Sequence, residues 1–139
     1  MSSQSFVLNK ILKNKGFSNT AVRQNIFESL QGKEPLTIQN IISSNPTIDR
    51  ASVYRTIDLF EKIGVVQRLQ IGWKYKIELT DQFHAHHHHV VCIVCGRIDN
   101  FSEPDYVESN VMRAASKLGY KPTSHQLEIR GLCPDCQTK

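Results

Sequence analysis

The first half of the chain repeats apolar residues at the three- and four-residue spacing of amphipathic helices. Four segments show this spacing: FVLNKILKNKG, SNTAVRQNIFESLQG, LTIQNIISS and DRASVYRTIDLFEKIG. We expect Gly16 to end the first helix, Asn45-Pro46 to end the third, and Ser18 or Thr20 to cap the second. The residues expected to be buried are Phe6, Val7, Ile11 and Leu12 in the first helix, and Val53, Ile57, Phe60 and Ile63 in the fourth.

After Gly64 the spacing changes to the two-residue alternation of a strand. In VVQRLQIGWKYKIEL the apolar residues Trp73, Tyr75 and Ile77 alternate with charged ones, and Gly72 marks a turn. The pattern predicts a hairpin with one apolar and one charged face. Four helices followed by a basic hairpin are compatible with a winged helix-turn-helix over residues 1–80, whose fourth helix would enter the DNA major groove.

The start of the fourth helix holds the best candidates for DNA contact. Arg55 can form a bidentate contact with guanine, and Tyr54 can pack on a thymine methyl group. Ser52 points outward on the same helix, and Lys74 lies on the charged face of the hairpin. The alternative is that Arg55 is a solvated surface residue and Tyr54 a half-buried one.

The second half of the chain contains both the helical spacing and the strand alternation of apolar residues. HHHHVVC and SHQLEIRGLC have the character of strands, and PDYVESNVMRAASKLGY has that of a helix. His125 is expected to share a strand face with Leu127 and Ile129. The expected buried residues of the helix are Val107, Val111, Ala115 and Leu118. We therefore expect an α+β protein with a second, smaller α/β domain over residues 81–139.

Charge also divides the chain. Residues 1–78 contain 11 Lys and Arg against 6 Asp and Glu, whereas residues 79–139 contain 6 against 7, and every His and Cys follows residue 83. A basic half without soft metal ligands favours a polyanion as its partner. No apolar run approaches the roughly 18 to 20 residues of a membrane span, and the N-terminus lacks a signal-peptide pattern. We expect a cytoplasmic protein with no membrane partner.

The four cysteines form two CxxC pairs, Cys92-Ile-Val-Cys95 and Cys133-Pro-Asp-Cys136. Each pair places two thiolates on one side of a tight turn, and two such pairs facing each other form a closed tetrahedral site that suits Zn²⁺. Such a site would be structural and would supply folding energy to a half too small to rely on its core. The alternative is four unrelated buried cysteines.

Four consecutive histidines precede the first cysteine pair. If this tract is extended, successive side chains point to opposite faces. His86 and His88 then share one face, and His87 and His89 share the other, so each pair is able to begin a separate metal site. The alternative is a solvated polar tract.

The motifs HHHHVVCIVCG and SHQLEIRGLCPDC, preceded by SVYRTIDLFEKIGVV, resemble those of the ferric uptake regulator family of metal-responsive repressors. The likeness runs from GFSNTAVR to the last CxxC. It implies an N-terminal winged helix that binds double-stranded operator DNA. It also implies a C-terminal α/β domain that forms a homodimer and carries the four-cysteine zinc site.

The resemblance also implies ligand sets for two further sites. The sensing site of the family matches Glu78, His87 and His89, and a second regulatory site matches His86, His88, Glu108 and His125. The regulatory ion would be Fe²⁺, Zn²⁺ or Mn²⁺. The predicted DNA contacts are Ser52, Tyr54, Arg55, Lys15, Arg23 and Lys74.

The chain departs from the family pattern at two ligand positions. Asn100, preceded by Asp99, stands where the family often has a carboxylate, and Glu34-Pro35 stands where it often has a histidine. Glu34, His84 or Asp99 are possible substitutes. The loop GFSNT lacks the basic residue often found there, which leaves Lys13 or Lys15 to contact the DNA backbone.

Three other functions compete with that of a metal-dependent repressor. A peroxide sensor of the same family would oxidise a histidine at bound iron. A metallohydrolase would need an open metal position with a base beside it, and would leave the basic half of the chain without a purpose. A zinc-ribbon interaction module would bind one metal per chain and sense nothing.

Overall fold

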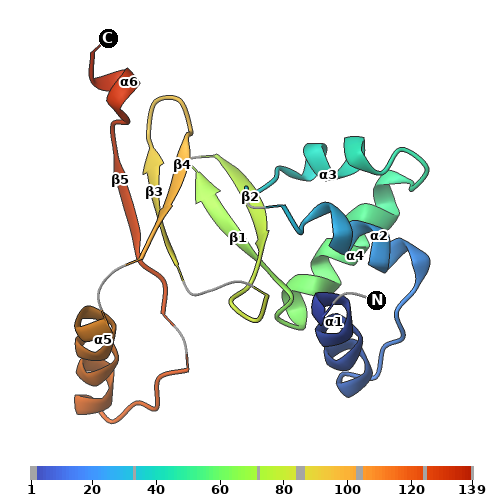
Figure 1. Cartoon of the computed structure of the whole chain (residues 1–139), viewed down its shortest axis with the longest axis horizontal. Helices are drawn as coiled ribbons and strands as arrows, with labels where there is room; N and C mark the ends of the chain where they lie inside the picture. The colour runs from blue at the N-terminus through green and yellow to red at the C-terminus, as the bar shows by residue number, and fades with distance from the viewer. Residues whose placement is uncertain are drawn as a thin grey trace. The chain divides into compact units, whose positions relative to one another are not determined.

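A computed structural model of the chain describes residues 3–32, 34–71, 73–83, 87–102, 105–123 and 125–138 (Figure 1). The chain divides into two compact units, residues 1–85 and 86–139. The sequence prediction placed this boundary at residue 80. The difference arises because Thr80 donates its backbone N–H to Val65 and the Phe83 ring packs edge-on against Phe27, so both belong to the first unit.

The first unit begins with four helices, as the apolar spacing predicted. They are α1 (Ser3–Asn14), α2 (Ala21–Ser29), α3 (Ile38–Ser44) and α4 (Arg50–Lys62). Thr20, Thr37 and Asp49 cap α2, α3 and α4, because each side chain accepts a hydrogen bond from a backbone N–H three residues later. Gly16 has a φ of 85° after α1, a left-handed conformation that favours glycine and ends the helix.

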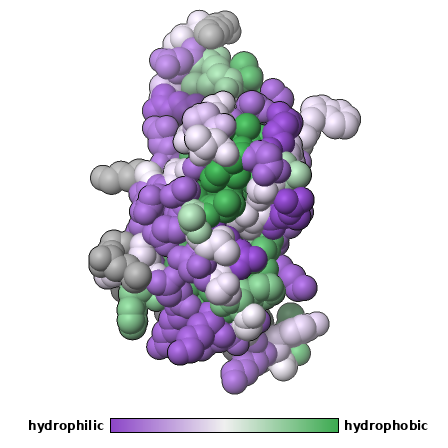
Figure 2. Space-filling model, turned by 90° about the vertical axis from the view of Figure 1, so that its right-hand side faces the viewer, coloured by the Kyte–Doolittle hydropathy of each residue, from purple (hydrophilic) through white to green (hydrophobic). Residues whose placement is uncertain are grey.

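The helices enclose one apolar core, and the predicted stripe of α4 lies within it: Val53, Ile57, Phe60 and Ile63 are all buried. In α1 the prediction was partly wrong. Ser5, Leu8 and Leu12 face the core, whereas Phe6 is 65% exposed. The three- and four-residue steps from Ser5 to Leu12 define the buried side, and Phe6 lies outside it. In Figure 2, hydrophilic residues surround a patch of hydrophobic ones near the middle of the view.

The predicted hairpin consists of β1 (Val66–Ile71) and β2 (Lys74–Leu79), paired antiparallel from Val66–Leu79 to Ile71–Lys74. Tyr75 and Ile77 lie on one face of β2, and its charged residues lie on the other. This is the alternation that the sequence predicted. Trp73 was wrongly placed on the apolar face. It lies in the turn between the strands and is fully exposed, because strand alternation does not extend into a turn.

The second unit contains a three-stranded sheet in the order β4-β3-β5, in which β3 pairs antiparallel with β4 and parallel with β5. Its elements are β3 (His88–Cys92), β4 (Ile98–Phe101), α5 (Asp105–Lys117), β5 (Glu128–Gly131) and α6 (Pro134–Gln137). The sequence did not predict β4. The strand predicted at SHQLEIRGLC is confined to four residues, so His125 precedes it rather than lying on one of its faces.

The buried stripe predicted for α5 is wrong for a single chain. Val111 is 46% exposed, Leu118 is 78% exposed and Val107 is half-buried. Apolar spacing identifies the side of a helix that becomes covered, but it does not say whether the cover comes from the same chain. Among the described residues no helix combines the length and apolarity that crossing a membrane requires.

Candidate metal centres and nucleic-acid interface

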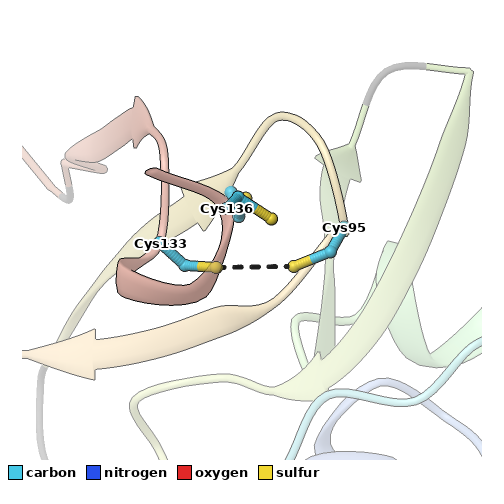
Figure 3. A group of neighbouring side chains, drawn as sticks. Cys95, Cys133 and Cys136 are labelled. Atoms are coloured by element: carbon cyan, nitrogen blue, oxygen red, sulfur yellow. Dashed lines mark hydrogen bonds between the residues drawn. The ribbon is translucent and has the colours of Figure 1, made fainter. Parts of the chain in front are cut away.

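The four cysteine sulfurs of the second unit lie within 4.8 Å of one another. Cys95 Sγ is 3.7 Å from Cys133 Sγ, and the thiol of Cys136 points into the same space (Figure 3). Zn–S bonds of about 2.3 Å in a tetrahedron place the sulfurs about 3.8 Å apart. The spacing therefore fits a four-coordinate zinc ion held by Cys92, Cys95, Cys133 and Cys136.

Local structure explains how the two cysteine pairs meet. Cys92 ends β3, and a turn that closes at Gly96, with a φ of 79°, carries Cys95 back beside it. Cys133 directly precedes α6, and its backbone carbonyl accepts a hydrogen bond from the backbone N–H of Cys136. The parallel pairing of Cys92 with Gly131 brings the second pair of cysteines next to the first. The sheet register thus assembles the site.

Two of these thiols differ greatly in acidity. Hydrogen bonds from the backbone of Cys133 and of Cys95 lower the pKa of Cys92 to about 5. The pKa of Cys136 is raised to about 12, first by its hydrogen bond with the Cys133 side chain and then by burial. Crowded thiolates repel one another, so a cation is needed before all four cysteines lose their protons. The donor set therefore fits a divalent metal ion.

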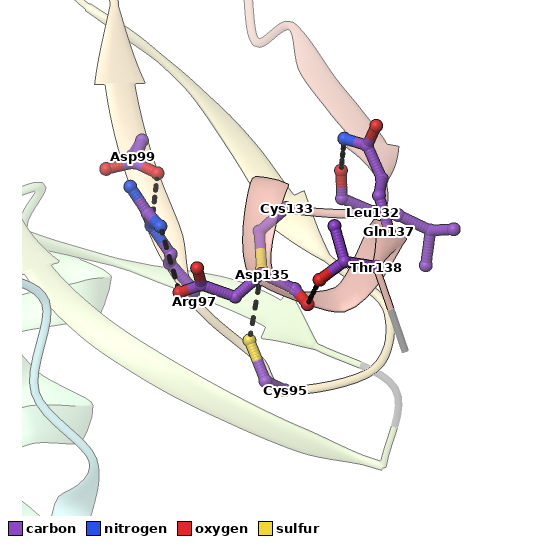
Figure 4. A network of polar contacts seen from close by, with 8 residues as sticks. All are labelled: Cys95, Arg97, Asp99, Leu132, Cys133, Asp135, Gln137 and Thr138. Atoms are coloured by element: carbon purple, nitrogen blue, oxygen red, sulfur yellow. Dashed lines mark hydrogen bonds and ion pairs between the residues drawn. The ribbon is translucent and has the colours of Figure 1, made fainter.

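Polar contacts join Arg97, just before β4, to Asp99 on β4 and to Asp135 on α6 (Figure 4). Arg97 Nε donates to Asp99 Oδ2 at 2.8 Å, and Arg97 Nη1 lies 4.0 Å from Asp135 Oδ2. Hydrogen bonding to Asp99 raises the pKa of Arg97 further. Asp99, a possible substitute ligand in the sequence analysis, is therefore engaged by a guanidinium.

A second cluster in the same unit joins His88, Glu108 and His125. The Nε2 atom of His88 lies 2.8 Å from Glu108 Oε1, and His125 Nε2 lies 2.6 Å from Glu108 Oε2. His88 is almost fully buried, and its ring also contacts Phe101. Two imidazoles converging on one carboxylate form a nitrogen–oxygen donor set suited to a divalent cation. The fourth predicted ligand, His86, lies outside the described residues, as does His84.

The other pair of histidines lies on the opposite side of the tract. The rings of His87 and His89 contact each other edge-on, with centroids 4.9 Å apart, and His88 between them is directed toward Glu108. This is the alternation expected of an extended backbone. The tract therefore supplies ligands to two faces.

Glu78, the third predicted ligand of the sensing site, belongs to the first unit. It lies on β2, is buried, and accepts a hydrogen bond from Gln67 Nε2 at 2.7 Å. His87 and His89 belong to the second unit. The joining of all three residues by one ion stays a prediction.

Part of the predicted DNA-contact set lies together in the first unit. Arg23, Ser52 and Arg55 line one groove of about 240 Å³ on α2 and α4. Tyr54 is 38% exposed on α4, with the Arg50 guanidinium against its ring. Lys15 and Lys74 are exposed elsewhere on the unit and do not line this groove. The groove and its rim present cations beside an exposed aromatic ring.

Sequence reasoning missed the residue that orients this helix end. Asp49 accepts hydrogen bonds from the backbone N–H and the hydroxyl of Ser52, and these bonds lower its pKa, the hydroxyl contributing most. The Ser52 hydroxyl in turn accepts from Arg55 Nη2 at 3.1 Å. The signal was available in the sequence, because Asp directly before a helical stretch is a favoured N-cap residue.

Comparisons with known proteins agree with this arrangement. The Ferric uptake regulator family matches residues 14–130. The chain is 33% identical over 138 residues to the ferric uptake regulation protein of Escherichia coli, covering 93% of this chain and 91% of that protein.

Solved structures give the same picture. The ferric uptake regulator of Vibrio cholerae superposes with a TM-score of 0.71 at 31% identity, covering 91% of this chain and 99% of that one. The manganese-containing regulator of Pseudomonas aeruginosa, at 22% identity and a TM-score of 0.78, covers 91% and 97% and shares the fold. The chain therefore belongs to the ferric uptake regulator family of metal-responsive transcriptional regulators.

Proposed function

We propose that this chain is a homodimeric, metal-activated repressor that binds operator DNA and controls genes of metal homeostasis or the oxidative-stress response. One observation supports this most directly. Strand β3 directs histidines to both of its faces and ends in a cysteine of the sulfur cluster. A single strand thus contributes to a four-cysteine site of the closed, structural type and to sites with nitrogen and oxygen ligands. Sites of the second type suit a regulatory ion that binds and leaves.

Members of this family regulate transcription and are not enzymes. The metallohydrolase alternative is therefore dropped. The zinc-ribbon alternative predicts one metal ion per chain, whereas the proposed regulator holds zinc at the cysteines and at least one further divalent ion. Elemental analysis of the purified protein distinguishes one metal per chain from two or three.

DNA binding is assigned to the first unit. We infer that α4 enters the major groove with Tyr54 and Arg55 toward the bases, while the β1–β2 hairpin contacts the DNA backbone through Lys74. We infer that Arg23, which lines the same groove as Ser52 and Arg55, contacts a phosphate. Tyr54, Arg55 and Lys74 are exposed, which supports the assignment, and Arg23 is half-buried.

The regulatory step is assigned to an ion bound by Glu78, His87 and His89. Such an ion would connect the two units and favour one arrangement of them over others. The ion raises the population of that arrangement only to the extent that it binds that arrangement more tightly than the others. A second regulatory ion, Fe²⁺, Mn²⁺ or Zn²⁺, is proposed to bind His86, His88, Glu108 and His125.

Dimerisation is assigned to the second unit. Strand β5 lies at one edge of its sheet, and an edge strand presents unpaired backbone groups that another chain can bind. Ile129 on β5 and Leu118 after α5 are exposed in the single chain. A second copy would cover such residues, and two α4 helices would then meet half-sites roughly 34 Å apart or a multiple of that distance.

The proposal is tested by measuring DNA affinity as a function of metal. A duplex is selected from a random-sequence pool with metal-supplemented protein, and its affinity is measured anaerobically with Fe²⁺, Mn²⁺, Zn²⁺ or a chelator. We expect tight binding with at least one ion and weak binding in chelator. Equal affinity in all conditions would remove the metal switch, and loss of binding after peroxide only with Fe²⁺ would favour the peroxide sensor.

A further inference from the structure

His89 on the central strand of the second unit has one directly paired neighbour on each side. Asn100 of β4 is its antiparallel partner, and Glu128 of β5 is its parallel partner. Side chains of directly paired residues lie on the same face of a sheet. Asn100 and Glu128 therefore flank His89 on the face that also carries the His87 ring, which contacts that of His89.

The two flanking residues differ in what they offer a metal ion. Asn100 has a neutral amide at the position where the family pattern often has a carboxylate. Glu128 has a carboxylate on the opposite flank of the same histidine. Glu78 and two neutral imidazoles would compensate only one of the two charges of a divalent ion, and Fe²⁺ and Mn²⁺ accept carboxylate oxygen readily. The chain thus keeps a carboxylate at a residue paired with His89, but on the other neighbouring strand.

The present contacts of Glu128 leave it available. Its Oε2 accepts from Arg130 Nε at 2.8 Å, two residues along the same strand. The Arg130 side chain is 54% exposed, and exposed ion pairs of this kind contribute little stability. Asp99 is a weaker candidate, because it pairs with Val90 on the opposite face and is held by Arg97.

We propose that Glu128 is a ligand of the regulatory ion at His87 and His89, replacing the carboxylate that Asn100 lacks. The proposal rests on the proposed function, since it requires an ion at these histidines. When the ion binds, the Glu128 carboxylate exchanges Arg130 for the metal. Arg130 and the ion then compete for the Glu128 carboxylate. This competition lowers the affinity for the metal, and both residues involved lie on β5.

The test is Glu128→Gln in the full-length protein with its cysteine site filled with zinc. Affinity for added Mn²⁺ and for added Zn²⁺ is measured by competition with a chelator, and zinc retained at the cysteines is measured as a control for folding. Changes around metal ligands typically cost 10- to 100-fold in affinity, so we expect a loss of roughly tenfold or more. Asp99→Asn, an exposed carboxylate on the other face, is the matched control and should leave affinity unchanged.

Two further variants separate ligation from a structural role. Arg130→Gln removes the competitor and should strengthen metal binding. Asn100→Asp added to Glu128→Gln places a carboxylate on the opposite flank of His89 and should restore affinity.

Several outcomes would overturn the proposal. Unchanged affinity in Glu128→Gln, or equal losses in Glu128→Gln and Arg130→Gln, would exclude Glu128 as a ligand. If Glu128 is excluded but the double variant His87→Ala, His89→Ala no longer binds an ion besides the zinc at the cysteines, the proposed function stands without Glu128 as a ligand. If the unmodified protein bound no metal beyond the zinc at its cysteines, both proposals would fail.

Discussion

Arg68 of β1 donates from Nη2 to Asp58 Oδ1 of α4 at 2.8 Å, and from Nε to Glu61 Oε1 of the same helix at 3.0 Å. Its guanidinium carbon also lies 4.6 Å from the ring centroid of Tyr75 on β2. One side chain therefore connects the proposed recognition helix to both strands of the hairpin. Because a guanidinium has fixed, planar donor geometry, these contacts define where the hairpin lies relative to α4.

Replacing Arg68 by Ala is expected to weaken DNA binding by roughly tenfold, about 1.4 kcal/mol of binding free energy. The hairpin would lose its fixed position, although its strands would remain paired. The ion pairs are partly exposed, so the free energy of unfolding should fall by only about 0.5–1 kcal/mol. Duplex affinity and thermal unfolding measure the two effects. Arg68→Lys keeps the positive charge but loses the planar guanidinium, so its duplex affinity should lie between those of the unmodified protein and Arg68→Ala. Unchanged duplex affinity in Arg68→Ala would show that DNA binding does not depend on the contacts of Arg68 with α4.

The first unit was largely predictable because its contacts are local in sequence. A helix buries residues three and four positions apart, so Val53, Ile57 and Phe60 of α4 were identified from spacing alone. The errors lie where spacing carries less information. Phe6 directly follows the buried Ser5 but lies off the buried side of α1. Trp73 continues the alternation of β2 by chance, although it lies in the turn.

The exposed Trp73 makes a direct test of hairpin contact possible, because it is the only tryptophan of the chain. Its fluorescence should change when the metal-loaded protein binds the selected duplex. Lys74→Ala should lower the slope of log affinity against log salt by about 1, since it removes one phosphate contact. Arg55→Ala should instead reduce the free energy of duplex binding by roughly 1–3 kcal/mol and weaken the sequence preference at one base pair. Unchanged Trp73 emission at saturating duplex would place the hairpin tip away from DNA.

Removal of zinc should unfold the second unit and leave the first folded. The second unit has few buried apolar side chains, whereas the first has a core of its own. A strong chelator, or Cys92→Ala, is expected to abolish the unfolding transition of the second unit in calorimetry. Ile93→Ala, an exposed residue in the same turn, is the matched control. Survival of both transitions in Cys92→Ala would show that zinc is not structural.

Zinc retention should also depend on pH in one direction. A thiol whose pKa is lowered in the folded protein contributes stability above its unfolded pKa and loses it as the pH falls through the folded value. For Cys92 that value is about 5. Because the bound ion further disfavours protonation, we expect zinc to be held at neutral pH and released only as the pH falls to about 5 or lower. A chromogenic chelator in the solution follows the release, and loss of zinc near pH 7 would contradict the assignment.

The second unit was harder to predict because its key contacts are distant in sequence. The cysteine pairs could be recognised from spacing, and the alternation of His87, His88 and His89 from strand geometry. The parallel register of β3 with β5 could not be derived, since many registers would have satisfied the same pattern. Pairing of His89 with Glu128 follows from that register alone. The exposed side of α5 is a different case, because the sequence signals burial that one chain does not provide.

The edge strand β5 supplies the last prediction. Ile129 is 48% exposed and lies at the edge of the sheet, on the surface proposed to bind a second copy. Ile129→Lys should produce a monomer in analytical ultracentrifugation, because a buried, unpaired ammonium would oppose association. Zinc content should stay normal, since the residue does not belong to the cysteine cluster. Operator affinity should fall sharply, because a single α4 contacts only one half-site. Phe6→Lys, with similar exposure in the first unit, should leave the dimer intact, and a dimeric Ile129→Lys would place the interface on another surface.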